Sequence, residues 1–250
     1  MEKEKVTENL KSMSLGDHLD ELRARLILSI AGLVAAVVIS LFFGSYFVKI
    51  LLLPYQKVVE EPSLLALKVT EPFMVYIKAV IVMAVLISCP WLFYQLWAFI
   101  SAGLYKHERK FIYIVAPFSA GLFIAGVLFF LLMIGPMTLR FFAQFNLGVD
   151  YIQYTPSVMD YVNFMLILSV VFGAAFQSPI AIIFAERMGL VSVQTLTKIR
   201  KYVLLGVFVV AAAITPSGDM ITMTALAIPL YILYELSIIV CRLWKRKRSK

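Results

Sequence analysis

A carboxylate beside apolar and aromatic side chains is the arrangement in this chain best suited to binding chemistry. Glu108 lies in segment 94–110, where aromatic residues end a long apolar run and basic residues follow. Such a carboxylate suits a ligand that is cationic at one point and apolar beside it, because a guanidinium binds a carboxylate through two parallel hydrogen bonds. Aromatic residues at a span end also form interfacial belts, so the segment alone leaves both interpretations open.

A second carboxylate, Glu21, lies in residues 14–25, which read SLGDHLDELRAR. The leucines of this segment fall on one stripe, which predicts an amphipathic helix lying along the inner membrane surface. Helical spacing also predicts the ion pairs Glu21–Arg25 and Asp20–Arg23. A self-paired interfacial helix therefore remains an alternative to a binding role.

No pattern in the chain predicts catalysis. The metalloprotease motif H-E-x-x-H and the nucleophile elbow G-x-S-x-G are both absent. The only histidines, His18 and His107, lie on the polar rims, and Cys89 and Cys241 imply no disulfide framework. We therefore expect no catalytic residue, no metal and no cofactor.

The composition predicts helices surrounded by lipid. Hydrophobic residues make up 62% of the chain and charged residues 15%, with a mean hydropathy of +0.90. The long apolar runs lack the alternation of barrel strands, so helices are the remaining way to satisfy the backbone in hydrocarbon. The net charge of +8 is spread beside the apolar runs rather than gathered in one patch, which argues against a nucleic-acid partner.

These runs predict an all-α fold with six transmembrane helices, several kinked by proline and the last two short. The fifth run, with about 20 Å of helix, is too short for an unperturbed bilayer of about 30 Å. Pro90 is the expected kink of the long second run. The expected spans are Leu26–Phe47, Pro72–Ile100, Ile112–Gly135, Met159–Ala185, Tyr202–Ile214 and Met220–Val240.

The basic residues predict the orientation. Of the 23 lysines and arginines, 18 fall before the first span, on the second and fourth breaks, and in the tail. By the positive-inside rule both termini are cytoplasmic, which requires an even number of spans. The chain then divides into an N-terminal cytoplasmic segment (1–25), a membrane domain (26–240) and a basic tail (241–250).

Polar residues inside the spans carry a cost in lipid and so need partners. Lys78 can extend its ammonium outward along the second helix, which is a structural role. We expect Gln95 to hydrogen-bond across helices and Glu235 to pair with the basic tail.

Three strings carry a specific resemblance. The strings are HLDELRAR (18–25), YQLWAF running on to LYKHER (94–109), and AIPLY followed by YE (227–235). In this order they closely resemble the TatC family, the six-helix receptor of the twin-arginine protein translocase, over residues 14 to about 242.

The resemblance implies export of folded proteins that carry a twin-arginine signal peptide. It also implies single-span partners of the TatA and TatB type in an oligomeric complex, energy from the proton-motive force, and location in the cytoplasmic membrane. The family's signal-binding surface matches these residues here: Glu21, Arg23, Phe99, Leu104, Tyr105 and Glu108. Pro54, in the first external loop, matches a family position that looks structural.

The chain departs from the family at two positions. Gln177 stands in the fourth span where the family commonly carries a glutamate, and an amide can hydrogen-bond but cannot bind a cation as a charge. Met223 stands where the family has a polar glutamine. Gln177, Gln95 and Glu235 are the expected intramembrane polar or partner contacts.

A secondary transporter or channel for a small solute is the alternative function. Such a protein needs a connected line of ionisable groups at mid-membrane, and this chain offers little beyond Lys78 and Glu235.

Overall fold

The computed structural model describes residues 15–59, 63–102, 109–144, 155–214 and 220–248. All elements in this part of the chain are helical, apart from an isolated parallel bridge between Leu65 and Ser157. In chain order they are α2 Leu15–Val58, α3 Glu71–Ala102, α4 Arg109–Phe129, the π-helical turn η2 Phe130–Ile134, α5 Gly135–Gln144, α6 Val158–Ala175, α7 Ser178–Arg187, α8 Val193–Lys198, α9 Arg200–Ile214 and α10 Met220–Arg248.

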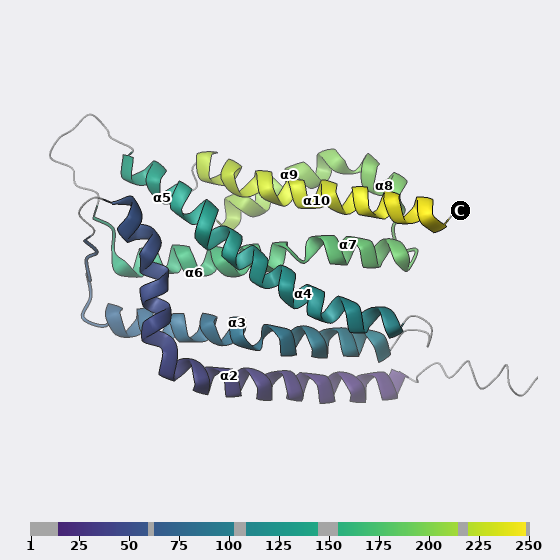
Figure 1. Ribbon diagram of the computed structural model, residues 1–250, viewed down its shortest axis with the longest axis horizontal. Coiled ribbons are helices and arrows are strands. Elements are labelled where there is room, and N and C mark those ends of the chain that lie inside the picture. Colours follow the sequence, from purple (N-terminus) through teal and green to yellow (C-terminus); the bar gives the residue numbers. More distant parts are fainter. Residues whose placement is uncertain (1–14, 60–62, 103–108, 145–154, 215–219, 249–250) are drawn as a thin grey trace, which may run out of the picture.

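The helices form an elongated bundle, with α2 along one edge and α10 along the other (Figure 1). Helix α3 packs against α2, α4 and α6, while α10 packs against α7 and α9. The start of α2, the end of α3, the start of α4 and the end of α10 lie at the same end of the bundle. Glu21 and the C-terminal turn of α3 are therefore brought to one end, which we call the Glu21 end.

Five helical stretches are long and apolar enough to cross a membrane, among the residues that the structure describes. Helix α9 is not one of them: its 15 residues span only about 22 Å at 1.5 Å per residue. The expected shortness does not extend to α10, which has 29 residues because the basic tail continues the helix to Arg248. The expected boundary at residue 241 thus falls inside this helix.

The expected surface helix over residues 14–25 is wrong in one respect. From Leu15 onward the segment is the first part of α2, which continues into the apolar run as one helix of 44 residues. Residues 17–31 contain no proline or glycine that would break the helix. The segment therefore extends the first span instead of turning away from it.

The third and fourth spans contain interruptions that their apolar runs do not reveal. Between α4 and α5 the Gly135 N–H donates to the Phe130 carbonyl, a π-helical bond. Pro136 follows directly and has no N–H for an α-helical bond, which favours such an irregularity. The fourth span breaks at Phe176 and Gln177, just before Pro179 in the first turn of α7. Pro54, Pro90 and Pro229, in contrast, lie inside continuous helices.

The main core lies where α2, α3, α6 and η2 meet. Its fully buried side chains include Leu51, Tyr55, Phe130, Met165 and Phe172. Close helix approach depends on a small residue: a Cβ on Gly126 of α4 would lie 2.6 Å from the Phe172 carbonyl oxygen of α6. A separate cluster joins α8 to α10, where the Tyr234 hydroxyl donates to the Leu196 carbonyl at 2.6 Å.

The end of the bundle opposite Glu21 is closed by hydrogen bonds between distant segments. The Leu65 N–H donates to the Pro156 carbonyl, and the Val158 N–H donates to the Leu65 carbonyl. The buried Glu71 carboxylate accepts from the Leu67 N–H at 3.0 Å and from the Ser157 hydroxyl at 3.4 Å. We call this arrangement the Glu71 end.

Hydrogen bonds from two tyrosine hydroxyls hold the last turns of α2 against the Glu71 end. The Tyr161 hydroxyl of α6 donates to the Leu51 carbonyl, and the Tyr55 hydroxyl donates to the Ser63 carbonyl at 2.8 Å. Pro54 lies between these two contacts in the sequence. The part that we expected to be an external loop is therefore helical as far as Val58 and held from two sides.

Candidate functional site

The Glu21 end is positioned by tight packing of α2 on α3. The Trp91 indole N–H donates to the Leu28 carbonyl at 2.9 Å, across the two helices. Gly32 leaves room for that ring, because a Cβ there would lie 2.3 Å from Trp91 Cδ1. These contacts fix the register in which the first turns of α2 meet the last turns of α3.

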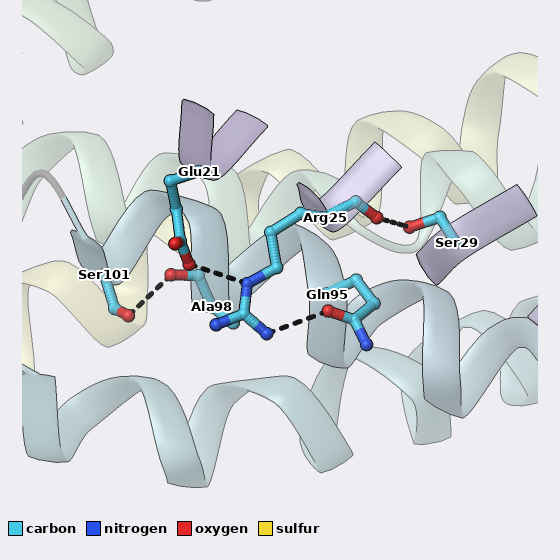
Figure 2. Close-up of polar contacts among 6 residues, drawn as sticks. All are labelled: Glu21, Arg25, Ser29, Gln95, Ala98 and Ser101. Atoms are coloured by element: carbon cyan, nitrogen blue, oxygen red, sulfur yellow. Dashed lines mark hydrogen bonds and ion pairs between the residues drawn. The ribbon is translucent and has the colours of Figure 1, made fainter. Parts of the chain in front are cut away.

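A polar chain links the two helices next to this contact (Figure 2). Arg25 Nε donates to Glu21 Oε1 at 2.8 Å, which is the expected pair within α2. Arg25 Nη1 also donates to Gln95 Oε1 of α3 at 3.0 Å. Gln95 is only 2% exposed, whereas the Arg25 and Glu21 side chains are 30% and 28% exposed. The carboxylate is thus reachable from solvent, and the guanidinium is anchored on its inner side.

Aromatic surface lies one turn further along α3. The rings of Phe99 and His18 stack with centroids 4.6 Å apart and planes 23° from parallel. Phe99 follows Gln95 by four residues, so the two side chains share one face of α3. The described part of the site therefore offers a carboxylate next to aromatic surface, the combination that suits a cationic and apolar ligand.

The other expected site residues differ in how far the structure describes them. Arg23 is exposed on α2, and the expected Asp20–Arg23 pair is wrong, because neither side chain forms an ion pair with the other. Leu104, Tyr105 and Glu108 lie outside the described residues. They belong to the connection between Ala102, where α3 ends, and Arg109, where α4 begins.

Gln177 takes part in a hydrogen-bond network between the two ends of the bundle. Its Nε2 donates to the Ser119 carbonyl of α4 at 3.0 Å. The fully buried Ser119 hydroxyl accepts from the Trp97 indole at 2.8 Å. The amide thus joins the break between α6 and α7 to α4, a contact that a carboxylate in its place cannot make as a donor. Met223, at the other departure, packs against the main core.

Glu235 pairs with a different partner from the one expected. Its Oε2 accepts from Arg200 Nη2 of α9 at 2.7 Å, and its Oε1 accepts from the Tyr231 hydroxyl at 3.1 Å. The expected pairing with the basic tail is wrong because the tail continues α10 away from Glu235, while α9 runs beside it. The pair joins α9 to α10.

Lys78 has neutral partners among the described residues. Its Nζ donates to Asn163 Oδ1 of α6 at 2.7 Å and lies 3.6 Å from Met159 Sδ. The expected bond of Gln95 across helices is confirmed, but sequence reasoning did not identify Arg25 as its partner. It also missed the contact of Lys78 with Asn163, since these residues lie 85 positions apart. Within the described residues no three His, Cys, Asp or Glu side chains are grouped to hold a metal.

Comparison with known proteins gives concordant results. Residues 17–229 match the family described as TatC, Sec-independent protein translocase protein. The chain is similar to the Sec-independent protein translocase protein TatC of Carboxydothermus hydrogenoformans, with 35% identity over 95% of this chain and 96% of that protein. It is 37% identical to the protein of the same name from Aquifex aeolicus, over 95% and 98% of the two chains. For the Escherichia coli K12 protein the identity is 33%, over 92% and 88%.

The fold has a counterpart among solved structures. A crystal structure of a twin-arginine translocase receptor, TatC, superposes with a TM-score of 0.81 at 35% identity, over 90% of this chain and 98% of that one. A second structure of the receptor, in the detergent DDM, gives a TM-score of 0.82.

Proposed function

Because the chain belongs to the TatC family of Sec-independent protein translocases, we propose that its Glu21 end binds the twin-arginine signal peptide of proteins to be exported. The protein is a multi-pass membrane receptor subunit of the translocase and not an enzyme. In the proposed complex, Glu21 and Glu108 pair with the signal's arginines. Phe99 and Leu104 contact its apolar stretch, while Arg23 and Tyr105 complete the surface.

The observation that carries this proposal is the position of the Glu21 carboxylate. It is partly exposed and lies on the helix face that packs beside α3, where Phe99 and His18 stack. A carboxylate desolvated on one side favours a guanidinium, which can bind it through two hydrogen bonds. Nonpolar surface next to the carboxylate suits the apolar stretch that accompanies the arginines.

We propose further that the chain crosses the membrane six times with both termini in the cytoplasm. The five long apolar helices and the shorter α9 together supply six crossings. The common position of the α2 start and the α10 end supports an even number (Figure 1). The lysines and arginines concentrated at that end support a cytoplasmic location in a cytoplasmic membrane.

The partners that we propose are single-span proteins of the TatA and TatB type, in an oligomeric complex that uses the proton-motive force. Gln177, Gln95 and Glu235 are the candidate polar contacts within the membrane. Their side chains already have partners inside this chain, so a partner helix would add to those bonds or exchange with them. No structural observation favours a small-solute transporter, since the ionisable Lys78 and Glu235 belong to separate local networks.

Photo-crosslinking tests the proposed site directly. A twin-arginine peptide with a photoreactive group is added to the protein in lipid nanodiscs, and the crosslinked fraction is compared between wild type and a Glu21→Ala/Glu108→Ala variant. The control is Asp20→Ala/Glu186→Ala, which removes the same charge at other sites. Losing two charge-assisted bonds is expected to lower binding about tenfold or more. Equal crosslinking in both double variants would mean that the proposed site is wrong.

A further inference from the structure

The Glu21 carboxylate already holds a guanidinium, that of Arg25. We propose that Arg25 is a built-in competitor: it occupies Glu21 while no signal is bound, and the signal's arginine must displace it. This inference rests on the proposed function of Glu21. It adds a residue that weakens signal binding, although Arg25 itself lies within the site.

The geometry suits an exchange because Arg25 makes its two bonds with different nitrogens. Nε bonds to Glu21 Oε1 at 2.8 Å and Nη1 bonds to Gln95 Oε1 at 3.0 Å. Figure 2 shows the two bonds leaving Arg25 toward different partners. When an incoming guanidinium takes the carboxylate, Arg25 can therefore keep its bond to Gln95. Arg25 then remains anchored on the α3 side without blocking Glu21.

The strength of the pair is right for a competitor. Glu21 and Arg25 are spaced i,i+4 on one helix, and each side chain is about 30% exposed. Such pairs are weak, so displacing Arg25 should reduce signal affinity only about twofold to threefold. A deeply buried pair would bar the signal, while an unpaired Glu21 would hold it more tightly and release it more slowly.

The bond to Gln95 distinguishes this arrangement from an ordinary surface pair. A self-contained i,i+4 pair needs no partner on another helix, yet Arg25 reaches the buried amide of α3, one turn before Phe99. Arg25 thus joins Glu21 to α3 at the surface where the apolar stretch would lie, and its bond to Gln95 keeps it on the α3 side when Glu21 is released. Arg25, the Glu21 carboxylate and the aromatic surface at Phe99 therefore lie on one face of the α2–α3 pair.

Peptide affinity in nanodiscs tests the inference. We expect Arg25→Gln to bind a twin-arginine peptide about twofold to threefold more tightly than wild type. Arg25→Met, which keeps the aliphatic stem, should do the same and decides the question if Arg25→Gln fails to fold. Lys198→Gln is the control, because it removes one exposed positive charge at the end of α8.

The double variant Glu21→Gln/Arg25→Gln separates the possible outcomes. The competitor has nothing to occupy without the carboxylate, so the double variant should bind no more tightly than Glu21→Gln alone. Equal or weaker binding by Arg25→Gln and Arg25→Met than by Lys198→Gln overturns the inference, as does a gain that persists without Glu21. If Glu21→Gln leaves the peptide affinity unchanged, the proposed function of Glu21 is wrong. If Glu21→Gln weakens binding but the Arg25 variants do not tighten it, only the proposed role of Arg25 is wrong.

Discussion

A glutamate lies at each end of the bundle, Glu71 in the first turn of α3 and Glu21 in α2 beside the last turns of α3, but the two carboxylates have different partners. Glu71 is 6% exposed and accepts hydrogen bonds from the Leu67 N–H, just before α3, and from the Ser157 hydroxyl at the start of α6. Glu21 is 28% exposed and its described partner is a neighbour on its own helix. The buried Glu71 carboxylate stabilises the fold, whereas the partly exposed Glu21 carboxylate binds a guanidinium that another can displace. Burial and the origin of the partners distinguish a structural acid from a binding acid.

The largest expected effect comes from making the same substitution at both ends. Glu71→Leu removes the acceptor of a backbone N–H and a buried hydroxyl, so we expect a loss of about 2–3 kcal/mol in the free energy of unfolding. Glu21→Leu should change it by less than about 0.5 kcal/mol, since it removes only a partly exposed i,i+4 pair. Thermal unfolding in detergent measures both. Equal losses at the two ends would abolish the distinction between them.

Gly32→Ala tests whether packing of α2 on α3 maintains the Glu21 end. Its Cβ would lie 2.3 Å from Trp91 Cδ1, which forces the indole or the helix to move. We expect a loss of about 2 kcal/mol, typical of overpacking, together with weaker peptide binding. Combining it with Trp91→Leu should recover part of the stability, because the obstructing ring is removed. No recovery in the double variant would show that another contact sets the helix spacing.

Gln177→Glu introduces the glutamate that the resemblance implies at this position, between the two ends of the bundle. A carboxylate cannot donate to the Ser119 carbonyl as the amide does, and it meets that oxygen with like charge. We expect a stability loss of about 1–2 kcal/mol at neutral pH. Export assays measure the effect on transport. Unaltered transport would mean that an ionised side chain at position 177 is unimportant in this protein. Gln144→Glu, at the exposed end of α5, controls for the added charge.

The smallest expected effect concerns the tyrosine bonds of the Glu71 end. Tyr161→Phe removes the hydroxyl that donates to the Leu51 carbonyl while keeping the buried ring. We expect a loss of about 1 kcal/mol, the usual net value of such a bond. Tyr46→Phe, on the exposed face of α2, should have no effect. If Tyr161→Phe lowers the free energy of unfolding no more than Tyr46→Phe does, this bond does not stabilise the Glu71 end.

The sequence predicted those features that depend on local pattern. The apolar runs gave the helices because their length and composition determine the structure in lipid, and the Glu21–Arg25 pair followed from i,i+4 spacing. Ser157 caps the N-terminus of α6, where its hydroxyl accepts from the Met159 N–H, a role typical of serine at this position.

Features that depend on tertiary contact could not be predicted in this way. The bonds from Arg25 to Gln95 and from Lys78 to Asn163 join helices whose relative register no local pattern specifies. Closeness in sequence favoured the basic tail as the partner of Glu235, whereas the packing of α9 on α10 selects Arg200. Within α2, the absence of glycine and proline between Gly16 and Gly32 was the available signal for a continuous helix.

Selectivity between arginine and lysine tests most directly whether Glu21 recognises a guanidinium. The affinities of a twin-arginine peptide and a twin-lysine peptide are measured on wild type, Glu21→Gln and Asp20→Asn in nanodiscs. A carboxylate favours the planar fork of arginine over the point charge of lysine, so the arginine-to-lysine affinity ratio should fall several-fold in Glu21→Gln and remain at the wild-type value in Asp20→Asn. An unchanged ratio in Glu21→Gln would contradict the account.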